Sequence, residues 1–201
     1  MGTLFLGRLA PVLLALAVLA PAPAAGGPAL QLEGSDWLIP SMQVKTGGKV
    51  KAPGGGAKAK GVEFDSLALE LGTDGTFTGT LAGELPLSGT WTRKSEKARV
   101  AKLTLDAASL EALETYEQEL AEAILLEEGF PADVVLTVVA SDLRVRVKTK
   151  PKAGTAALHV RGRFRFEGSV TLSGQQLPLR AKSRLRGTSL AVELADLLAA
   201  G

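Results

Sequence analysis

The chain has 201 residues, with 23 lysines and arginines, 21 aspartates and glutamates, and no cysteine. The absence of cysteine excludes disulfide bonds, thiolate metal sites and the lipid-modified cysteine of bacterial lipoproteins. Stability must therefore come from packing, and a chain of this length can bury about 70% of its unfolded surface, enough for one core.

The first residues have the layout of a cleavable export signal. Arg8 is their only charge, an apolar run follows over residues 9–20, and Ala22 and Ala24 supply the small residues of a cleavage site. The apolar run is well short of the roughly 20 residues that span a bilayer. We predict a signal peptide at residues 1–24 and a single domain at residues 25–201, exported to the periplasm or the extracellular space. A retained anchor is the alternative.

Residues 45–61 have the composition of a solvated connection, rich in lysine and glycine and free of acidic residues. We expect a mobile loop here, with its tip at residues 53–56. The segment before it contains Pro40, which restricts that segment to an edge strand or a bulge.

Apolar residues alternate from residue 62 to residue 105, as expected for β-strands. A turn at Thr73, Asp74 and Gly75 divides the first two strands, which predicts a hairpin, and two further strands complete an antiparallel meander. The alternating positions are Phe64, Leu67, Leu69 and Leu71; Phe77, Gly79 and Leu81; Leu85, Leu87, Gly89 and Trp91; and Val100, Leu103 and Leu105.

The period changes at residues 106–128, where apolar residues recur every three or four positions. This spacing predicts one amphipathic helix with Asp106 as its N-cap, ending before Gly129 and Pro131. Its polar positions are almost all acidic. Glu114 and Glu117 lie on one side of such a helix, but a solvated acidic face explains them better than a catalytic pair.

Period-two alternation returns after the helix and predicts four or more further strands, with a bulge near Ser141 and Asp142. The C-terminal residues 187–201 suit a strand followed by a short helix. Together the patterns predict a mainly β protein, an antiparallel barrel or strongly curved sheet of about eight to nine strands, with one long amphipathic helix inserted mid-chain.

Basic residues occupy the polar side of three of these late strands. If the strands are neighbours, the cations share one face of the sheet, which we call the basic face. It consists of Arg144, Arg146, Lys148, Arg161, Arg163, Arg165, Arg180, Lys182, Arg184 and Arg186. Cations directly opposite one another across strands are destabilising, so such a face needs a partner or full solvation.

Several partners for the basic face are open. The acidic helix is an internal candidate, and an anionic lipid headgroup, lipopolysaccharide or another polyanion is an external one. A face that is merely solvated remains the simplest interpretation. Nucleic acid is a poorer candidate, because aromatic residues that would stack on bases do not alternate with these cations.

No motif for catalysis, a cofactor or a metal is present, so we predict no catalytic residue, no cofactor, no metal site and no enzymatic activity. The single histidine, His159, lies among the cations and suits a surface position. Trp37 and Trp91 are each most simply a core anchor on a strand. The alternative is that they line a ligand cavity, formed by Trp37, Trp91, Phe64, Phe77, Phe164 and Phe166.

The segment Gly89-Thr90-Trp91, which follows the predicted hairpin, resembles the glycine-x-tryptophan strand of lipocalin-like (calycin-like) β-barrels. The layout is also similar to that of uncharacterised exported bacterial proteins with a lipocalin-like pattern. The resemblance covers about a third of the chain, departs from lipocalins in its central helix, and implies a barrel fold but no ligand residues.

Two functions follow as expectations. The first is an exported binding module for an apolar or anionic amphiphilic ligand, such as a lipid or a lipopolysaccharide-like molecule. The alternative is a structural or protein-interaction component of the cell envelope that uses the basic face and the acidic helix. An outer-membrane barrel is a weaker hypothesis, because aromatic residues are scarce and the C-terminus lacks one.

Overall fold

The computed structural model describes residues 29–52, 55–95, 98–127 and 132–198. The predicted export signal lies outside these residues. Nine strands and one α-helix follow in chain order: β1 (Ser35–Ala52), β2 (Gly55–Leu71), β3 (Thr76–Leu81), β4 (Leu85–Arg93), β5 (Val100–Leu105), α1 (Ala107–Glu127), β6 (Ala132–Lys150), β7 (Thr155–Leu172), β8 (Gln175–Thr188) and β9 (Val192–Glu193). Short 3₁₀ turns occupy Pro151–Ala153 and Ala195–Leu197.

The first eight strands form a closed antiparallel barrel. Each strand pairs with its neighbours in the chain, β8 pairs with β1, and the pairing of β6 with β7 completes the ring. β9 adds a short extra strand beside β7. The prediction of a mainly β meander with one helix inserted mid-chain is confirmed.

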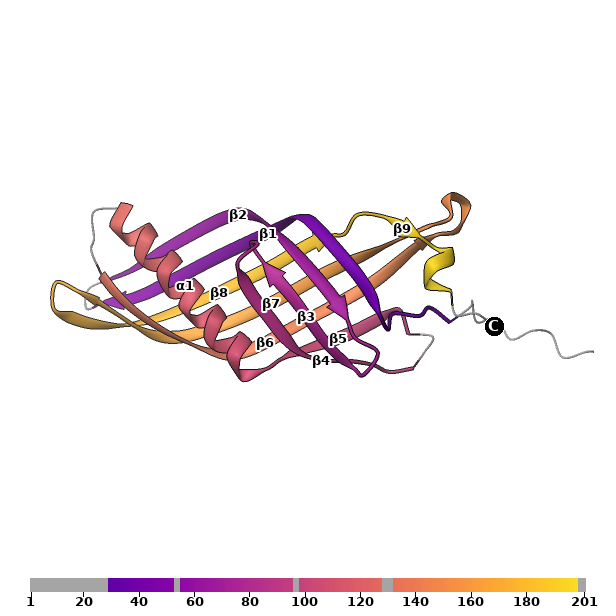
Figure 1. Ribbon diagram of the computed structural model, residues 1–201. Helices are drawn as coiled ribbons and strands as arrows, with labels where there is room; N and C mark the ends of the chain where they lie inside the picture. Colours follow the sequence, from indigo (N-terminus) through magenta and orange to yellow (C-terminus); the bar gives the residue numbers. More distant parts are fainter. Residues whose placement is uncertain (1–28, 53–54, 96–97, 128–131, 199–201) are drawn as a thin grey trace, which may run out of the picture.

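The barrel has two unlike halves, because β3, β4 and β5 are short while the other five strands of the ring are long (Figure 1). β2 pairs with β3 only from residue 67 onward, and β5 pairs with β6 only over residues 143–146. We call the part with all eight strands the closed half. In the open half, β2, β1, β8, β7 and β6 form a curved sheet, and α1 lies across the gap between β2 and β6 (Figure 1).

Local sequence signals placed the helix and its start correctly. The Oδ1 atom of Asp106 accepts a hydrogen bond from the backbone N–H of Ser109 at 2.8 Å, as an N-cap should. The second Asp106 oxygen accepts from the Ser88 hydroxyl at 2.6 Å, which joins the helix start to β4.

The prediction of a loop at residues 45–61 is wrong. β1 continues to Ala52 and β2 begins at Gly55, so the described part of the lysine-rich segment forms two paired antiparallel strands. Residues 53–54 of the predicted loop tip lie outside the described residues. Residues 42–50 of β1 pair with β2 on one side and with β8 on the other. This double pairing satisfies the backbone and outweighs the poor strand propensity of glycine and lysine.

Two irregularities interrupt the long strands. Register shifts between Ile39 and Met42 of β1, which contains Pro40, so the predicted bulge is confirmed. A second shift lies between Val138 and Ala140 of β6, slightly before the predicted position at Ser141. The C-terminal strand followed by a short helical turn also agrees with the prediction.

Candidate functional site

A cavity lies in the open half, because small residues stand at inward positions where the rest of the barrel has large ones. Inward residues of β1 alternate from Met42 and Val44, both buried, to Gly48. A Cβ atom on Gly48 would meet only Leu179 Cδ1, at 3.6 Å. Ala181 of β8 is likewise small and inward. The space that these residues leave is about 440 Å³, within the range of roughly 300–1,000 Å³ for small-molecule sites.

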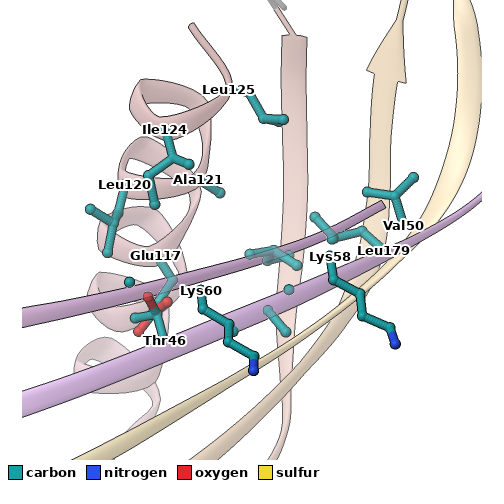
Figure 2. Close-up of a pocket in the computed structure, with 15 residues that line it drawn as sticks. Thr46, Val50, Lys58, Lys60, Glu117, Leu120, Ala121, Ile124, Leu125 and Leu179 are labelled. Atoms are coloured by element: carbon teal, nitrogen blue, oxygen red, sulfur yellow. The ribbon is translucent and has the colours of Figure 1, made fainter. Parts of the chain in front are cut away.

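The cavity has an apolar wall and a charged rim (Figure 2). Successive turns of α1 supply the apolar side chains of one wall, and β1, β6 and β8 supply those of the facing wall. The apolar lining consists of Val50, Leu120, Ala121, Ile124, Leu125, Leu136, Leu179 and Ala181. Lys58 and Lys60 of β2 stand at the rim, with exposed side chains that point away from α1, and Glu117 and Thr46 lie together at one end (Figure 2).

α1 is joined to β6 by two carboxylates that take the place of a missing strand. The backbone N–H of Val138 donates to Glu114 Oε1 at 2.7 Å, and that of Val134 donates to Glu122 Oε1 at 2.9 Å. From Glu114 to Glu122 the helix rises about 12 Å, and from Val138 to Val134 the strand spans about 13 Å, so the spacings match. The helix therefore closes the free edge of β6.

The attachment of α1 to β2 is weaker. In the described part of the chain, the hydrogen bond between them runs from the Tyr116 hydroxyl to Asp65 Oδ2, at a long 3.4 Å. Residues 55–66 of β2 have no strand partner on the side of the gap. The rim lysines lie along this same edge, so the cavity opens between β2 and α1.

Acidic residues of α1 and β2 gather near the end of the cavity that Glu117 lines. The Glu117 carboxylate is buried and accepts a short hydrogen bond from the buried Ser183 hydroxyl. Burial raises the pKa of Glu117, the Ser183 bond opposes this rise, and nearby Glu63 adds to it. Burial and then Asp65 raise the pKa of Glu63. Burial and the same carboxylates raise the pKa of Tyr116 to about 12.

The aromatic residues predicted to line a cavity lie elsewhere. Five of them are buried in the core: Trp37, Phe77, Trp91, Phe164 and Phe166. Both indole N–H groups have hydrogen-bond acceptors: Trp37 Nε1 donates to Ser35 Oγ at 2.8 Å, and Trp91 Nε1 donates to the Gly72 carbonyl at 3.2 Å. None of the five lines the cavity under α1.

The prediction that Phe64 faces the interior is wrong. Alternation from the buried Leu67 places Asp65 and Glu63 on the inside, and Phe64 is 67% exposed on the outside. Its position has the opposite parity to the leucines that follow it, and a strand side chain cannot change face without a bulge.

The ten residues of the basic face are all exposed on the outer side of β6, β7 and β8. Within the described parts of the chain no ion pair joins them to the acidic helix, which lies on the concave side of the sheet (Figure 1). His159 lies among them and contacts Thr188 Oγ1 through Nδ1 at 3.0 Å. Partial burial and then Lys148, Arg161 and Arg146 lower its pKa.

Sequence reasoning missed the residues that build the cavity. Glu114 and Glu122 were part of a uniformly acidic helix, and their separation of two helical turns was the one available signal that they share a side. Gly48 fell in the predicted loop, and Ala181 fell on the apolar side of a predicted strand with nothing to mark it as part of a cavity. Their role depends on which strands pair, which the sequence does not state.

Three negative findings apply to the described residues alone. They contain no cluster of three or more histidine, aspartate or glutamate side chains that could hold a metal ion. No helix among them has the length and hydropathy needed to cross a membrane. Every buried side-chain nitrogen and oxygen has a hydrogen-bond partner.

Comparisons with known proteins add little to this geometry. No protein-family model and no curated protein matches the chain. A solved multidomain protein including DUF1735 from Bacteroides ovatus is similar over 79% of this chain, with a TM-score of 0.30 and 11% identity. The match covers 56% of that chain, so this protein spans about half its length, and at this TM-score the likeness carries no argument.

Proposed function

We propose that the protein is an exported, non-enzymatic binding module that holds the apolar chain of an anionic amphiphile between α1 and the curved sheet. The observation that carries this proposal is the cavity of about 440 Å³, with an apolar lining and a lysine rim. A volume of this size suits one chain better than the many chains of a lipopolysaccharide.

The charges around the cavity suggest how such a ligand would lie. The buried Glu117 stands at one end, where an anionic head would meet a carboxyl group in a poorly solvated site. Lys58 and Lys60 stand at the rim, where an anionic head keeps contact with water. The apolar chain would therefore run along Leu120 and Ile124, with the head at the lysines.

The ligand itself is best sought by native mass spectrometry of protein purified from its own cell envelope. A bound single-chain amphiphile supports the proposal. Protein that carries no ligand, and that also binds no fluorescent long-chain fatty acid, would favour the alternative of a structural envelope component.

A filled cavity tests the location of the site. In Gly48→Leu the new side chain would enter the cavity, because the nearest atom to its Cβ lies at an ordinary contact distance. We expect at least about a tenfold loss of fatty-acid affinity, since the apolar surface of the site would be occupied. Ala68→Leu, at an exposed position on β2, is the control. Equal binding by both folded variants contradicts the proposed site.

The rim is tested by comparing a fatty acid with the alcohol of the same chain length. Lys58→Gln with Lys60→Gln should weaken acid binding by about two- to fivefold per lysine, as exposed charges do, and leave alcohol binding unchanged. Lys94→Gln with Lys152→Gln, both exposed and outside the cavity lining, is the charge-matched control. An equal loss for acid and alcohol would place the head elsewhere.

A further inference from the structure

Cations stand directly opposite one another in rows across the outer side of the sheet. In one row, Arg163 of β7 faces Arg184 of β8, which faces Lys45 of β1. In the next row, Arg165 faces Lys182. Further opposed pairs are Arg144 with Arg161, Arg161 with Arg186, and Arg180 with Lys49.

Few acidic residues balance these cations. Among the described residues, the ion pairs on this side are Arg144 with Asp142, at 2.7 Å, and Arg180 with Glu167, at 3.2 Å. Like charges directly opposite across strands destabilise a sheet, so the rows retain a net attraction for an external anion. Burial lowers the pKa of His159, and its basic neighbours Lys148, Arg161 and Arg146 lower it further.

The rows surround a hollow on the outer wall of the barrel. The hollow has a volume of about 410 Å³ and a floor that includes Gly47, Gly48 and Gly61. Six cations stand around it: Lys45, Lys49, Lys58, Lys60, Lys182 and Arg184. We call it the basic hollow. It has the size and charge to receive a phosphate group together with part of the molecule that carries it.

Exposed apolar side chains lie beside the basic hollow. Val62 is 54% exposed and stands opposite Lys45, and Phe64 is 67% exposed and stands opposite Gln43. A valine and a phenylalanine in water beside a dense group of cations suit a surface that meets both headgroups and the acyl boundary of a membrane. A dissolved polyanion or an acidic protein surface would pair with the cations but would provide less apolar surface to cover Phe64.

We propose that the protein docks on an anionic lipid bilayer through the basic hollow and the adjoining rows, with Val62 and Phe64 entering the headgroup region. The lysines of the cavity rim, Lys58 and Lys60, also border the hollow, so the cavity mouth lies next to the docked surface. The inference does not rest on the proposed function. Ala121→Leu, at a position on α1 that lines the cavity and not the basic hollow, narrows the cavity and should still bind vesicles.

The test is cosedimentation of the mature chain with phosphatidylcholine vesicles prepared with and without phosphatidylglycerol. We expect binding to the anionic vesicles alone, weakened by salt as screening shortens the range of the charges. Lys182→Glu with Arg184→Glu should reduce vesicle affinity by more than about tenfold, since each nearby cation accounts for about fivefold. The control reverses the charge of Lys94 and Lys152, which lie outside the rows, by the same substitution to glutamate.

Phe64→Ala separates a bilayer from a dissolved polyanion. It should reduce vesicle affinity by about tenfold, because a phenylalanine that enters the membrane loses water contact. Binding to dextran sulfate should be unchanged. Leu126→Ala, an exposed leucine on α1, is the apolar control and should not alter vesicle binding. The proposal is overturned if vesicle binding is equal with and without phosphatidylglycerol. It is also overturned if Phe64→Ala, shown by circular dichroism to be folded, binds vesicles as well as the parent chain does.

Discussion

The two carboxylates that join α1 to β6 can be removed one at a time. Glu114→Ala leaves the backbone N–H of Val138 without its acceptor, and Glu122→Ala does the same for Val134. Glu→Gln at either position keeps an acceptor oxygen and removes only the charge. Comparing the alanine variants with the glutamine variants therefore separates the loss of the hydrogen bond from the loss of the charge that strengthens it.

The magnitude follows from the kind of bond. A hydrogen bond to a charged acceptor contributes about 1.5–3 kcal/mol net, and both glutamates are half-buried, so the lower end applies. A loss of about 1.5 kcal/mol corresponds to a roughly tenfold larger population of the state in which the helix edge is open. The two bonds lie about 12 Å apart along α1, so the double alanine variant should lose about 3 kcal/mol.

Hydrogen exchange of individual amides measures this opening. The Val134 and Val138 amides should exchange about tenfold faster in the alanine variants, and less so in the glutamine variants. The Val135 and Thr137 amides point to β7 by the alternation of an antiparallel ladder and serve as internal references. Glu119→Ala, at an exposed position of α1, is the control variant. If the Val134 and Val138 amides behave alike in Glu114→Ala and Glu119→Ala, the carboxylates do not hold the helix.

Two further predictions concern stability. Burial raises the pKa of Glu117 in the folded chain, so the free energy of unfolding should fall as pH rises from the ordinary glutamate value of 4.5 through the raised pKa. In urea unfolding, Glu117→Gln should therefore be more stable than the parent chain at neutral pH, and this difference should disappear below pH 4.5. Gly89 has φ +153°, and a Cβ there would lie 2.1 Å from the Thr104 carbonyl oxygen, so Gly89→Ala should cost at least about 3 kcal/mol of unfolding free energy. Gly83→Ala, at φ +77° with no neighbour within 4 Å, isolates the backbone strain and should cost only about 1 kcal/mol; similar losses in both would contradict the steric argument.

The residues that sequence reasoning placed well are those whose signals are local. Asp106 begins the helix because its side chain caps the N–H of a residue three positions later. Pro40 marks a bulge because it cannot donate to a ladder. The five aromatic residues predicted to face the interior and found buried there follow strand alternation, and the cations of the basic face follow the same alternation on the opposite side.

Tertiary structure decided the rest. Residues 45–52 and 55–61 form strands because β8 and β2 both pair with β1, and no composition rule anticipates two partners. The cavity exists because β3, β4 and β5 are too short to pair with the whole of β2 and β6, which leaves a gap that α1 covers. The periodicity of apolar residues and the helix-capping residue determine the mainly β meander and its helix. The position of the cavity depends instead on which strand edges lack a partner, and this is a property of the assembled barrel.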